Sequence, residues 1–435
     1  MKAERTDAPP GASRVAPVPP GAPVDTTQRG GWLERYERLL GARTLRALEA
    51  RARRLRGHRI VMVNTTKTGG GVAEILHRVV MILNELGITT TWEVMEGDDQ
   101  FFGVTKKMHN ALHGHVQPLT DADREVYRER TRMEAERLAL DGDLILIHDP
   151  QPAYLIDHRR EPGQRWVWRC HIDLSRRDET YWEFLRPAVE RYETAIFSHI
   201  EFVPPLTVPA VLVPPSIDPF AEKNREMEEE EIVAICERLG LDATSPWITQ
   251  VSRFDRIKDP IGVLEAFRLV RARRPSHLVL AGGSASDDPE GAEVLAEVRE
   301  KAKGVKDVTI LELPPQSDKE INAIQRASTV VLQKSLREGF ALTVSEGLWK
   351  RRAVVASAVG GIPLQVLHER TGLLVRSVEG TAFQCIRLLD NPELRRELGV
   401  EGHIHVRDNF LHTREVRDYL AVFAGLMEGA THPSA

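Results

Sequence analysis

The chain alternates short apolar stretches with helical patterns, and it does so in two successive runs. The first run places strands at 59–64, 144–147, 166–170, 194–197 and 211–213. The second places them at 247–251, 278–281, 308–311, 330–333, 354–356 and 373–375. Alternation of this kind is typical of parallel sheets joined by right-handed crossovers. We therefore predict an α/β protein with two facing, doubly wound domains and an inter-domain cleft at the carboxyl ends of the strands.

A proline-rich turn at 214–219 marks the expected boundary between the domains. A length of 435 residues exceeds what one hydrophobic core usually supports. We expect a Pro-rich disordered tail over 1–31, an N-terminal domain over 32–215 that opens with a helical lead-in, and a C-terminal domain over 220–412. The remaining segment, 413–435, should form a C-terminal helix that could close back over either domain, with the N-terminal domain as the first candidate.

Composition excludes several classes of protein. A net charge of −5 argues against a general nucleic-acid binder. The sequence contains no run of eighteen apolar residues, so we predict no membrane span, and its start lacks a signal-peptide pattern. Three widely spaced cysteines give neither a disulfide framework nor a metal motif. A cytoplasmic protein is the simplest expectation.

Two cations five positions apart, Arg253 and Lys258, follow a predicted strand. A guanidinium fork beside a lysine point charge suits a departing diphosphate, whose negative charge must be stabilised as it develops. The alternative is a pair of ordinary surface cations near a helix start.

Two carboxylates, Glu338 and Glu346, lie eight positions apart around the start of another helix. Eight helical residues span about 12 Å, whereas glycosidase carboxylates lie about 5 to 9.5 Å apart, so a glycosidase pair is disfavoured. We expect Glu338, with Gly339 and Phe340, to bind sugar hydroxyls and Glu346 to bind the ribose of a nucleotide. The alternative is two exposed glutamates that the helix dipole favours.

Glycines and polar strand ends supply further candidates. Gly70 and Gly71 lie between a strand and a helix, where backbone N–H groups can bind a diphosphate, although a purely structural turn remains the alternative. In the first half, two predicted strands end in His148-Asp149 and in His171-Ile-Asp173, where substrate contacts are expected. The D-x-D patterns at 121–123 and 141–143 are interpreted as turn and cap chemistry rather than metal ligands.

From about residue 32 to the C-terminus, the chain resembles the retaining glycosyltransferases of family four, which have the GT-B fold of two Rossmann-like domains. Within that family it is similar to the nucleotide-sugar-dependent trehalose synthases, also called trehalose glycosyl-transferring synthases. Seven segments carry this resemblance: 64–77, 104–112, 148–152, 168–174, 214–219, 251–255 and 337–340. Ala341 departs from the pattern, because many family members carry glycine there.

The resemblance implies reversible transfer of glucose from an NDP-glucose (UDP-, ADP- or GDP-glucose) to glucose, forming α,α-trehalose with retention at the anomeric carbon. It assigns catalytic or binding roles to the diphosphate ligands Arg253 and Lys258, and to the donor-sugar ligands Glu338 and His171. It places Asp149 and Asp173 at the acceptor. The C-terminal domain would hold the nucleotide sugar and the N-terminal domain the acceptor. No tightly bound cofactor or metal is implied, with Mg²⁺ at most a counter-ion of the diphosphate, and a homodimer is expected.

Two alternatives remain at this point. A trehalose phosphorylase that uses glucose-1-phosphate would need only a phosphate at Arg253 and Lys258, and Glu346 would lose its ribose. A non-catalytic regulator that binds sugar nucleotides belongs to a different class, but it has less need to neutralise a leaving group. The preferred nucleobase and the direction of the reaction in the cell do not follow from the sequence.

Overall fold

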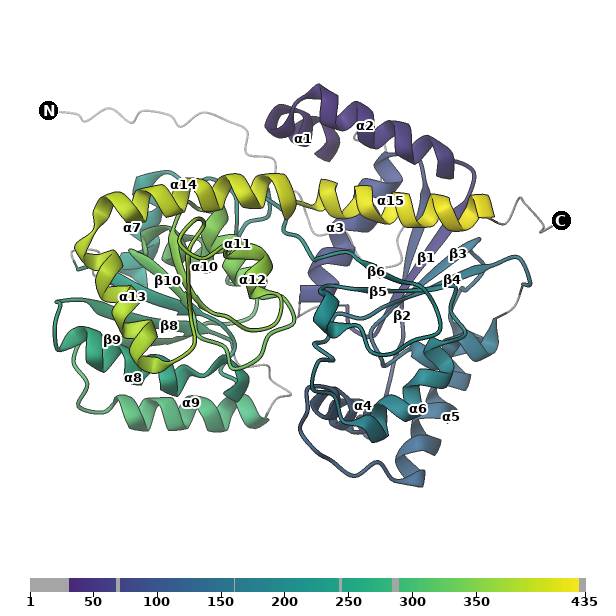
Figure 1. Cartoon of the computed structure of the whole chain (residues 1–435), viewed down its shortest axis with the longest axis horizontal. Coiled ribbons are helices and arrows are strands. Elements are labelled where there is room, and N and C mark those ends of the chain that lie inside the picture. Colours follow the sequence, from purple (N-terminus) through teal and green to yellow (C-terminus); the bar gives the residue numbers. More distant parts are fainter. Residues whose placement is uncertain (1–30, 68–70, 160, 242–244, 284–288, 430–435) are drawn as a thin grey trace, which may run out of the picture.

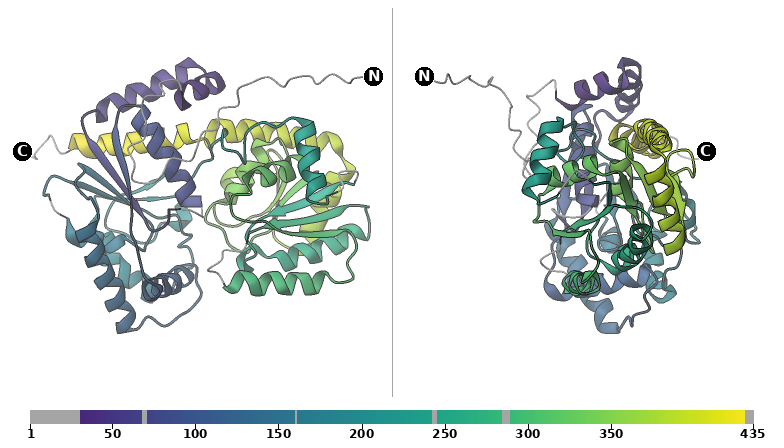
Figure 2. Two further views of the ribbon diagram at one scale, coloured as in Figure 1. Left: turned by 180° about the vertical axis from the view of Figure 1, so that it is seen from behind. Right: turned by 90° about the vertical axis from the view of Figure 1, so that its left-hand side faces the viewer.

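The structure is a computed structural model that describes residues 31–67, 71–159, 161–241, 245–283 and 289–429. It contains two six-stranded sheets with strand orders β2-β1-β3-β4-β5-β6 and β12-β11-β10-β7-β8-β9. Each pair of neighbouring strands in the two sheets is parallel. The two sheets and their helices form two lobes side by side (Figures 1 and 2). The predicted pair of doubly wound α/β halves is confirmed.

The first sheet collects strands from the first half of the chain. Its strands are β1 (Arg59–Asn64), β2 (Thr89–Val94), β3 (Leu144–His148), β4 (Arg165–Arg169), β5 (Thr194–Phe197) and β6 (Ala210–Leu212). The helices around it are α1 (Trp32–Leu40), α2 (Ala42–Ala52), α3 (Gly71–Glu85), α4 (Asp99–Leu112), α5 (Asp121–Arg137) and α6 (Glu179–Val189), with 3-10 turns η1 (Arg53–Leu55), η2 (Ala153–His158) and η3 (Ile200–Phe202). Strand β2 was not among the predicted strands. The helical lead-in is two helices, because Gly41 has a φ of 84° between them.

The second sheet is built in the same way from the second half. Its strands are β7 (Trp247–Val251), β8 (His277–Gly282), β9 (Val308–Glu312), β10 (Val330–Gln333), β11 (Ala353–Ser357) and β12 (Leu373–Val375). The helices are α7 (Glu229–Arg238), α8 (Pro260–Arg271), α9 (Pro289–Ala302), α10 (Asp318–Ala327), α11 (Leu342–Trp349), α12 (Ile362–Gln365), α13 (Val378–Asp390) and α14 (Pro392–Asn409), with the 3-10 turn η4 (Arg256–Lys258).

Strands buried on both faces explain the near-continuous apolar runs. In β3, Leu144 and Leu146 belong to one buried cluster, whereas Ile145 and Ile147 belong to another on the opposite face of the sheet. Successive side chains of a strand point to opposite faces, so helices must cover both. Substrate contacts are therefore expected beyond the ends of the strands rather than along their length.

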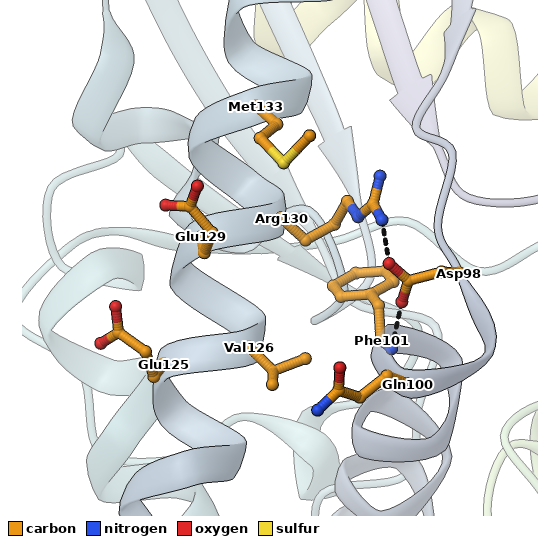
Figure 3. Close-up of a pocket in the computed structure, with 8 residues that line it drawn as sticks. All are labelled: Asp98, Gln100, Phe101, Glu125, Val126, Glu129, Arg130 and Met133. Atoms are coloured by element: carbon orange, nitrogen blue, oxygen red, sulfur yellow. Dashed lines mark hydrogen bonds and ion pairs between the residues drawn. The ribbon is translucent and has the colours of Figure 1, made fainter.

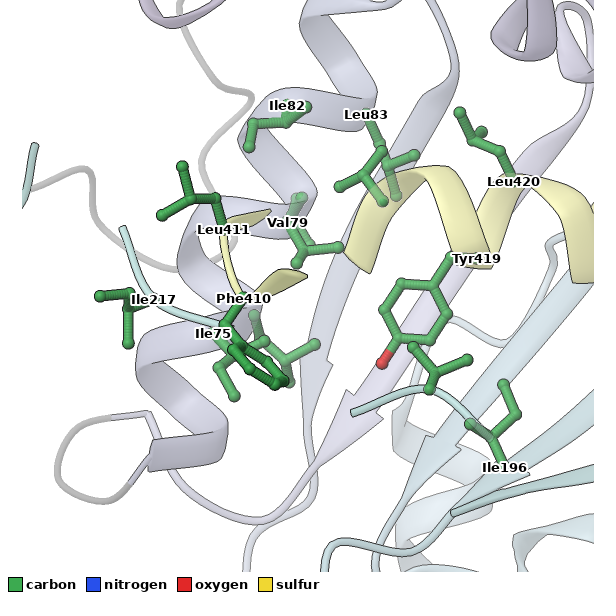
Figure 4. Packing of buried hydrophobic residues seen from close by; sticks show 14 of the residues in the cluster. Ile75, Val79, Ile82, Leu83, Ile196, Ile217, Phe410, Leu411, Tyr419 and Leu420 are labelled. Carbon is green, nitrogen blue, oxygen red and sulfur yellow. The ribbon is translucent and has the colours of Figure 1, made fainter. Parts of the chain in front are cut away.

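The last helix, α15 (His412–Gly429), returns to the first half of the chain. Together α14 and α15 run across both lobes, and α15 packs against α2 and α3 (Figure 1). Tyr419 and Leu420 of α15 pack into the same cluster as Leu83 of α3 and Ile196 of β5 (Figure 4). That cluster also contains Val344 of α11, so one hydrophobic core runs through both halves.

Two segments cross between the halves side by side. Ile217 and Leu411 form an isolated parallel bridge, and the Ile217 N–H donates to the Phe410 carbonyl at 2.8 Å. Among the described helices, none is long and apolar enough to cross a membrane.

Candidate active site

Lys258 lies in a short turn whose backbone is fixed on both sides. Asp255 begins η4 by accepting a hydrogen bond from a backbone N–H within the turn at 3.0 Å. Asp259 ends it with a φ of 48° and caps α8. The Gln250 amide on β7 donates to the Lys258 carbonyl at 2.9 Å. Since the backbone of the turn is fixed, the position of the Lys258 ammonium depends only on the conformation of its side chain.

Glu338 is the partner of that ammonium. Lys258 Nζ lies 2.5 Å from Glu338 Oε2, and the two side chains are 16% and 10% exposed. Ser335 Oγ donates to the same carboxylate oxygen at 3.1 Å, and the Gln333 amide in turn donates to Ser335 at 2.9 Å. Two groups predicted for the diphosphate and the donor sugar thus meet directly. A cation held against a carboxylate in a largely buried site can serve one anionic and one hydroxylated ligand side by side.

Close backbone packing holds the segment that carries Glu338. A Cβ on Gly360, whose φ is 53°, would lie 1.6 Å from the Glu338 carbonyl oxygen. A Cβ on Gly339 would lie 2.6 Å from the His171 carbonyl oxygen, so this turn touches the other half of the chain. Ala341 has a φ of 71°, in the region that favours glycine, which gives a physical meaning to the residue that departs from the family pattern.

The Phe340 ring does not lie open to a ligand. Phe340 is 6% exposed, and its ring packs at 5.5 Å from that of Phe410 in the shared core. Its side chain therefore contributes to packing, and any contact with a sugar must come from the backbone of this turn.

His171 and Asp149 lie together at the ends of β4 and β3. The His171 backbone N–H donates to Asp149 Oδ1 at 2.8 Å. The His171 Nε2 lies 3.0 Å from the Nδ1 of His148, and the two rings stack with centroids 5.3 Å apart. Burial raises the pKa of Asp149 to about 6, although its bond to His171 and the nearby Arg169 act to lower it. Burial, with Arg169 nearby, lowers the pKa of His148 to about 3 and that of His171 well below its usual value. The two imidazoles are neutral at pH 7, and one of them can hydrogen-bond a hydroxyl.

The other predicted ligands lie around this centre. Arg253 is exposed, and one of its contacts is with Asp255 at 3.4 Å. Asp173 is 6% exposed and accepts from a backbone N–H at 2.9 Å. Burial lowers the pKa of Arg337, and Asp173 counteracts this. Burial also lowers the pKa of His113, at the C-terminal end of α4, to about 4, assisted by Arg337 and Lys258, so side chains of both halves share one electrostatic environment.

Glu346 is separate from this group. It is 1% exposed, and its Oε1 lies 2.8 Å from Lys223 Nζ. The same ammonium lies 2.6 Å from Glu74 Oε2, in the first turn of α3. The carboxylate predicted for the ribose is thus enclosed in an ion bridge within the protein rather than exposed at a helix start.

The glycine turn is described only in part. Gly70 lies outside the described residues. Gly71 begins α3, and a Cβ there would lie 2.9 Å from the Leu342 side chain at the start of α11. The start of α3 therefore faces the helix that carries Glu346.

The aspartates of the D-x-D patterns make cap and backbone contacts. Asp123 completes a capping box with Thr120 at the start of α5. Asp141 and Asp143 bond the side chain and the backbone of Arg59, each at 2.7 Å. In the part of the chain that the structure describes, no group of three His, Cys, Asp or Glu side chains could hold a metal ion.

Sequence reasoning missed Lys223, Glu74, Ser335, Arg337 and His113 as members of this region. A lysine between a proline turn and an acidic helix carries no motif, and its carboxylate partners come from distant segments. Ser335 and Arg337 lie between the end of β10 and Glu338, so their position at a strand end was the available signal.

A further pocket lies away from these residues, between α4 and α5. It is lined by Phe101, Val126 and Met133 among others, and Arg130 pairs with Asp98 at its edge (Figure 3). None of the predicted site residues lines it.

Comparison with known proteins defines the class first. Residues 233–403 match the family described as glycosyl transferases group 1. The solved structure of an α,α-trehalose 6-phosphate synthase from Burkholderia multivorans superposes with a TM-score of 0.69 at 17% identity, covering 86% of this chain and 100% of that one. The two facing parallel sheets are accordingly those of a GT-B glycosyltransferase.

The first half narrows the class. Residues 62–204 match the family described as trehalose synthase, N-terminal domain. A trehalose synthase of Pyrococcus horikoshii is 43% identical over 400 residues, 91% of this chain and 96% of that protein. A trehalose phosphorylase of Pleurotus pulmonarius is 28% identical and aligns with 86% of this chain but 58% of its own. The chain belongs to the trehalose synthase family of glycosyltransferases.

Proposed function

We propose that this protein is a retaining hexosyltransferase that transfers glucose from an NDP-glucose to glucose and forms α,α-trehalose reversibly. The observation that carries the proposal is the contact between Lys258 and Glu338 at 2.5 Å, next to His171. A leaving diphosphate needs a cation, and the glucosyl group beside it needs hydrogen-bond acceptors. With Arg253 they would form the donor site.

The acceptor would bind in the first half, at Asp149 and Asp173. Asp149 has a φ of 69°, and strained backbone of this kind is common at functional sites. In this proposal Asp149 binds a hydroxyl of the acceptor glucose, and the departing diphosphate takes the acceptor proton on the same face of the sugar. Neutral His171 would lie against the donor glucose.

A trehalose phosphorylase is the second candidate, because such enzymes are also relatives of this chain, although more distant ones. The buried Glu346 would then have no ribose to bind. A non-catalytic regulator remains a third candidate. We further propose a cytoplasmic homodimer that needs no tightly bound cofactor, with Mg²⁺ serving at most as a counter-ion of the diphosphate.

A panel of donors and acceptors tests the proposal. The protein is incubated with glucose and, separately, with UDP-, ADP- or GDP-glucose or glucose-1-phosphate, and the products are identified by chromatography and NMR. We expect trehalose and a nucleoside diphosphate from at least one nucleotide sugar. Turnover with glucose-1-phosphate alone would establish the phosphorylase, and tight binding without turnover would establish the regulator.

The pKa of Asp149 predicts a pH dependence for the acceptor. As the carboxyl ionises near pH 6, it becomes a better acceptor for a glucose hydroxyl, so kcat/KM for glucose should rise from pH 5 through about 6. Asp149→Asn should remove this rise. A pH profile of kcat/KM for glucose checks it, and an identical profile in the variant would contradict the assignment.

The same shift predicts a stability effect of known sign. Because the folded state binds this proton more tightly than the unfolded state does, wild type should lose stability relative to Asp149→Asn as pH rises from about 4 to about 6. Above that range the difference should stay constant. Urea unfolding across this pH range provides the measurement.

A further inference from the structure

An ion bridge joins the two halves at the carboxylate predicted for the ribose. Lys223, on the segment that crosses between the halves, lies 2.8 Å from Glu346 of α11 and 2.6 Å from Glu74 of α3. The exposed fractions of the three side chains are 14%, 1% and 31%. Two carboxylates from different halves therefore share one largely buried ammonium.

The charge of Glu346 depends on this ammonium. Burial acts to raise the pKa of Glu346, but Lys223 and then Lys350 reverse the effect, so the net shift is downward. The Lys350 ammonium donates hydrogen bonds to the Asn224 and Gln325 side chains at 3.0 and 2.7 Å. The direct ion pair of the Glu346 carboxylate is therefore the one with Lys223. Glu74, whose pKa burial raises, stands on the other side as a like charge.

Other charged groups complete the environment. Asp318, at the start of α10, interacts electrostatically with Lys223, Glu346 and Glu222. Without the ammonium, Glu346 and Glu74 would face one another in a poorly solvated site, and one of them would take up a proton. A protonated Glu346 loses acceptor capacity.

The backbone around Lys223 is held independently of its ammonium. Asn224 is fully buried, and its carbonyl accepts from the Trp349 indole at 3.2 Å. The Asn322 amide donates to the Glu222 and Arg225 carbonyls at 2.8 and 2.9 Å. We therefore expect the segment to keep its place when the side chain of Lys223 is changed.

We propose that Lys223 is a positioning residue for the nucleotide: it holds the Glu346 carboxylate ionised and oriented to accept hydrogen bonds from the ribose hydroxyls of the donor. This inference rests on the proposed function and deepens it. Through Lys223, the ion bridge also connects α11 of the second half with α3, the helix that follows the glycine turn in the first half. Discrimination between ribose and deoxyribose nucleotides thereby depends on a lysine outside both sheets.

Steady-state kinetics of Lys223→Met test the proposal, with Lys319→Met as the matched control. Lys319 is an exposed lysine that pairs with Glu231 at 2.7 Å. Loss of hydrogen bonds to an ionised carboxylate should raise KM for the nucleotide sugar about tenfold or more, leaving KM for glucose within about twofold. The control should match wild type in both constants. Melting temperatures show that each variant is folded.

Two further measurements separate positioning from a merely structural role. Wild type should bind the 2′-deoxy form of its nucleotide sugar more weakly than the ribose form, and Lys223→Met should largely lose this preference. Adding Glu74→Gln to Lys223→Met removes the like charge and should restore part of the lost donor affinity. An unchanged ribose preference together with no rescue would overturn the proposal. A lower KM for the donor in Lys223→Met would also overturn it, because the lysine would then be competing with the ribose.

Binding measurements keep this test independent of turnover. Calorimetric titration of UDP, ADP and GDP, each beside its 2′-deoxy form, reports the ribose preference directly in wild type and in Lys223→Met. If no donor is turned over, the proposed function fails. The inference about Lys223 would still be supported by a ribose preference that this variant loses, and overturned by one that it keeps.

Discussion

Lys258→Ala is expected to lower kcat by about 10³-fold or more, with a much smaller change in the stability of the fold. Removing one preorganised group that stabilises a developing negative charge typically costs about 10²–10³ in rate, and a full positive charge on a phosphoryl oxygen is worth about 10³–10⁵. The Lys258 ammonium is held in a turn fixed by Asp255 and Asp259, so its electrostatic effect needs little reorganisation. Ser335 still donates to Glu338 in the variant, which limits the cost of leaving that carboxylate without its cation.

The same turn offers a matched control, Arg256→Ala. Arg256 is exposed and pairs with Glu297 of α9 at 3.0 Å, away from Glu338. Rates are measured with saturating nucleotide sugar and glucose, and folding is checked by circular dichroism and melting temperature. We expect the control to keep its rate within about threefold, since exposed ion pairs contribute little. If Lys258→Ala is as fast as Arg256→Ala, Lys258 does not stabilise the leaving diphosphate.

The architecture could be predicted because periodicity encodes it locally. Buried parallel strands appear as apolar runs, and all eleven predicted strands overlap strands of the structure, as in Trp247–Val251 and Val330–Gln333. Strand β2, Thr89–Val94, lies at the edge of its sheet, where three threonines and a glutamate leave no apolar run. An edge strand is defined by its neighbour's hydrogen bonds, which the sequence does not display.

The site could be predicted only in its separate parts. Lys258 and Glu338 each follow a strand of one parallel sheet, so their meeting follows from topology. The enclosure of Glu346 does not, because Lys223 and Glu74 reach it from other segments through tertiary packing. Phe340 shows the same limit in another form: its position beside Glu338 predicted a contact with the sugar, but its ring is part of the core.

Gly360→Ala is the second change with a large expected effect, and it acts on geometry rather than charge. A Cβ at this position would lie 1.6 Å from the Glu338 carbonyl oxygen, a separation that atoms cannot adopt, so the segment carrying Glu338 must move. Catalytic groups lose about 10²-fold in rate when they are displaced by about 1 Å. We expect kcat to fall by at least about that factor, and the free energy of unfolding to fall as well.

Gly304→Ala separates displacement from backbone strain. Gly304 also has a positive φ, 77°, but a Cβ there would have nothing within 4 Å. Both substitutions carry the conformational cost of an alanine in the left-handed region, about 1–2 kcal/mol. The contact with Glu338 is present only at Gly360. We therefore expect Gly304→Ala to lose stability while keeping wild-type kcat, whereas Gly360→Ala loses stability and kcat together, as measured by urea unfolding and initial rates. Equal kcat values in the two variants would show that the Glu338 backbone tolerates movement. The three nearest atoms that a Cβ on Gly360 would meet all belong to Glu338. A loss of kcat in Gly360→Ala that exceeds that of the control would therefore show that the reaction depends on the position of Glu338, in a variant that keeps the carboxylate.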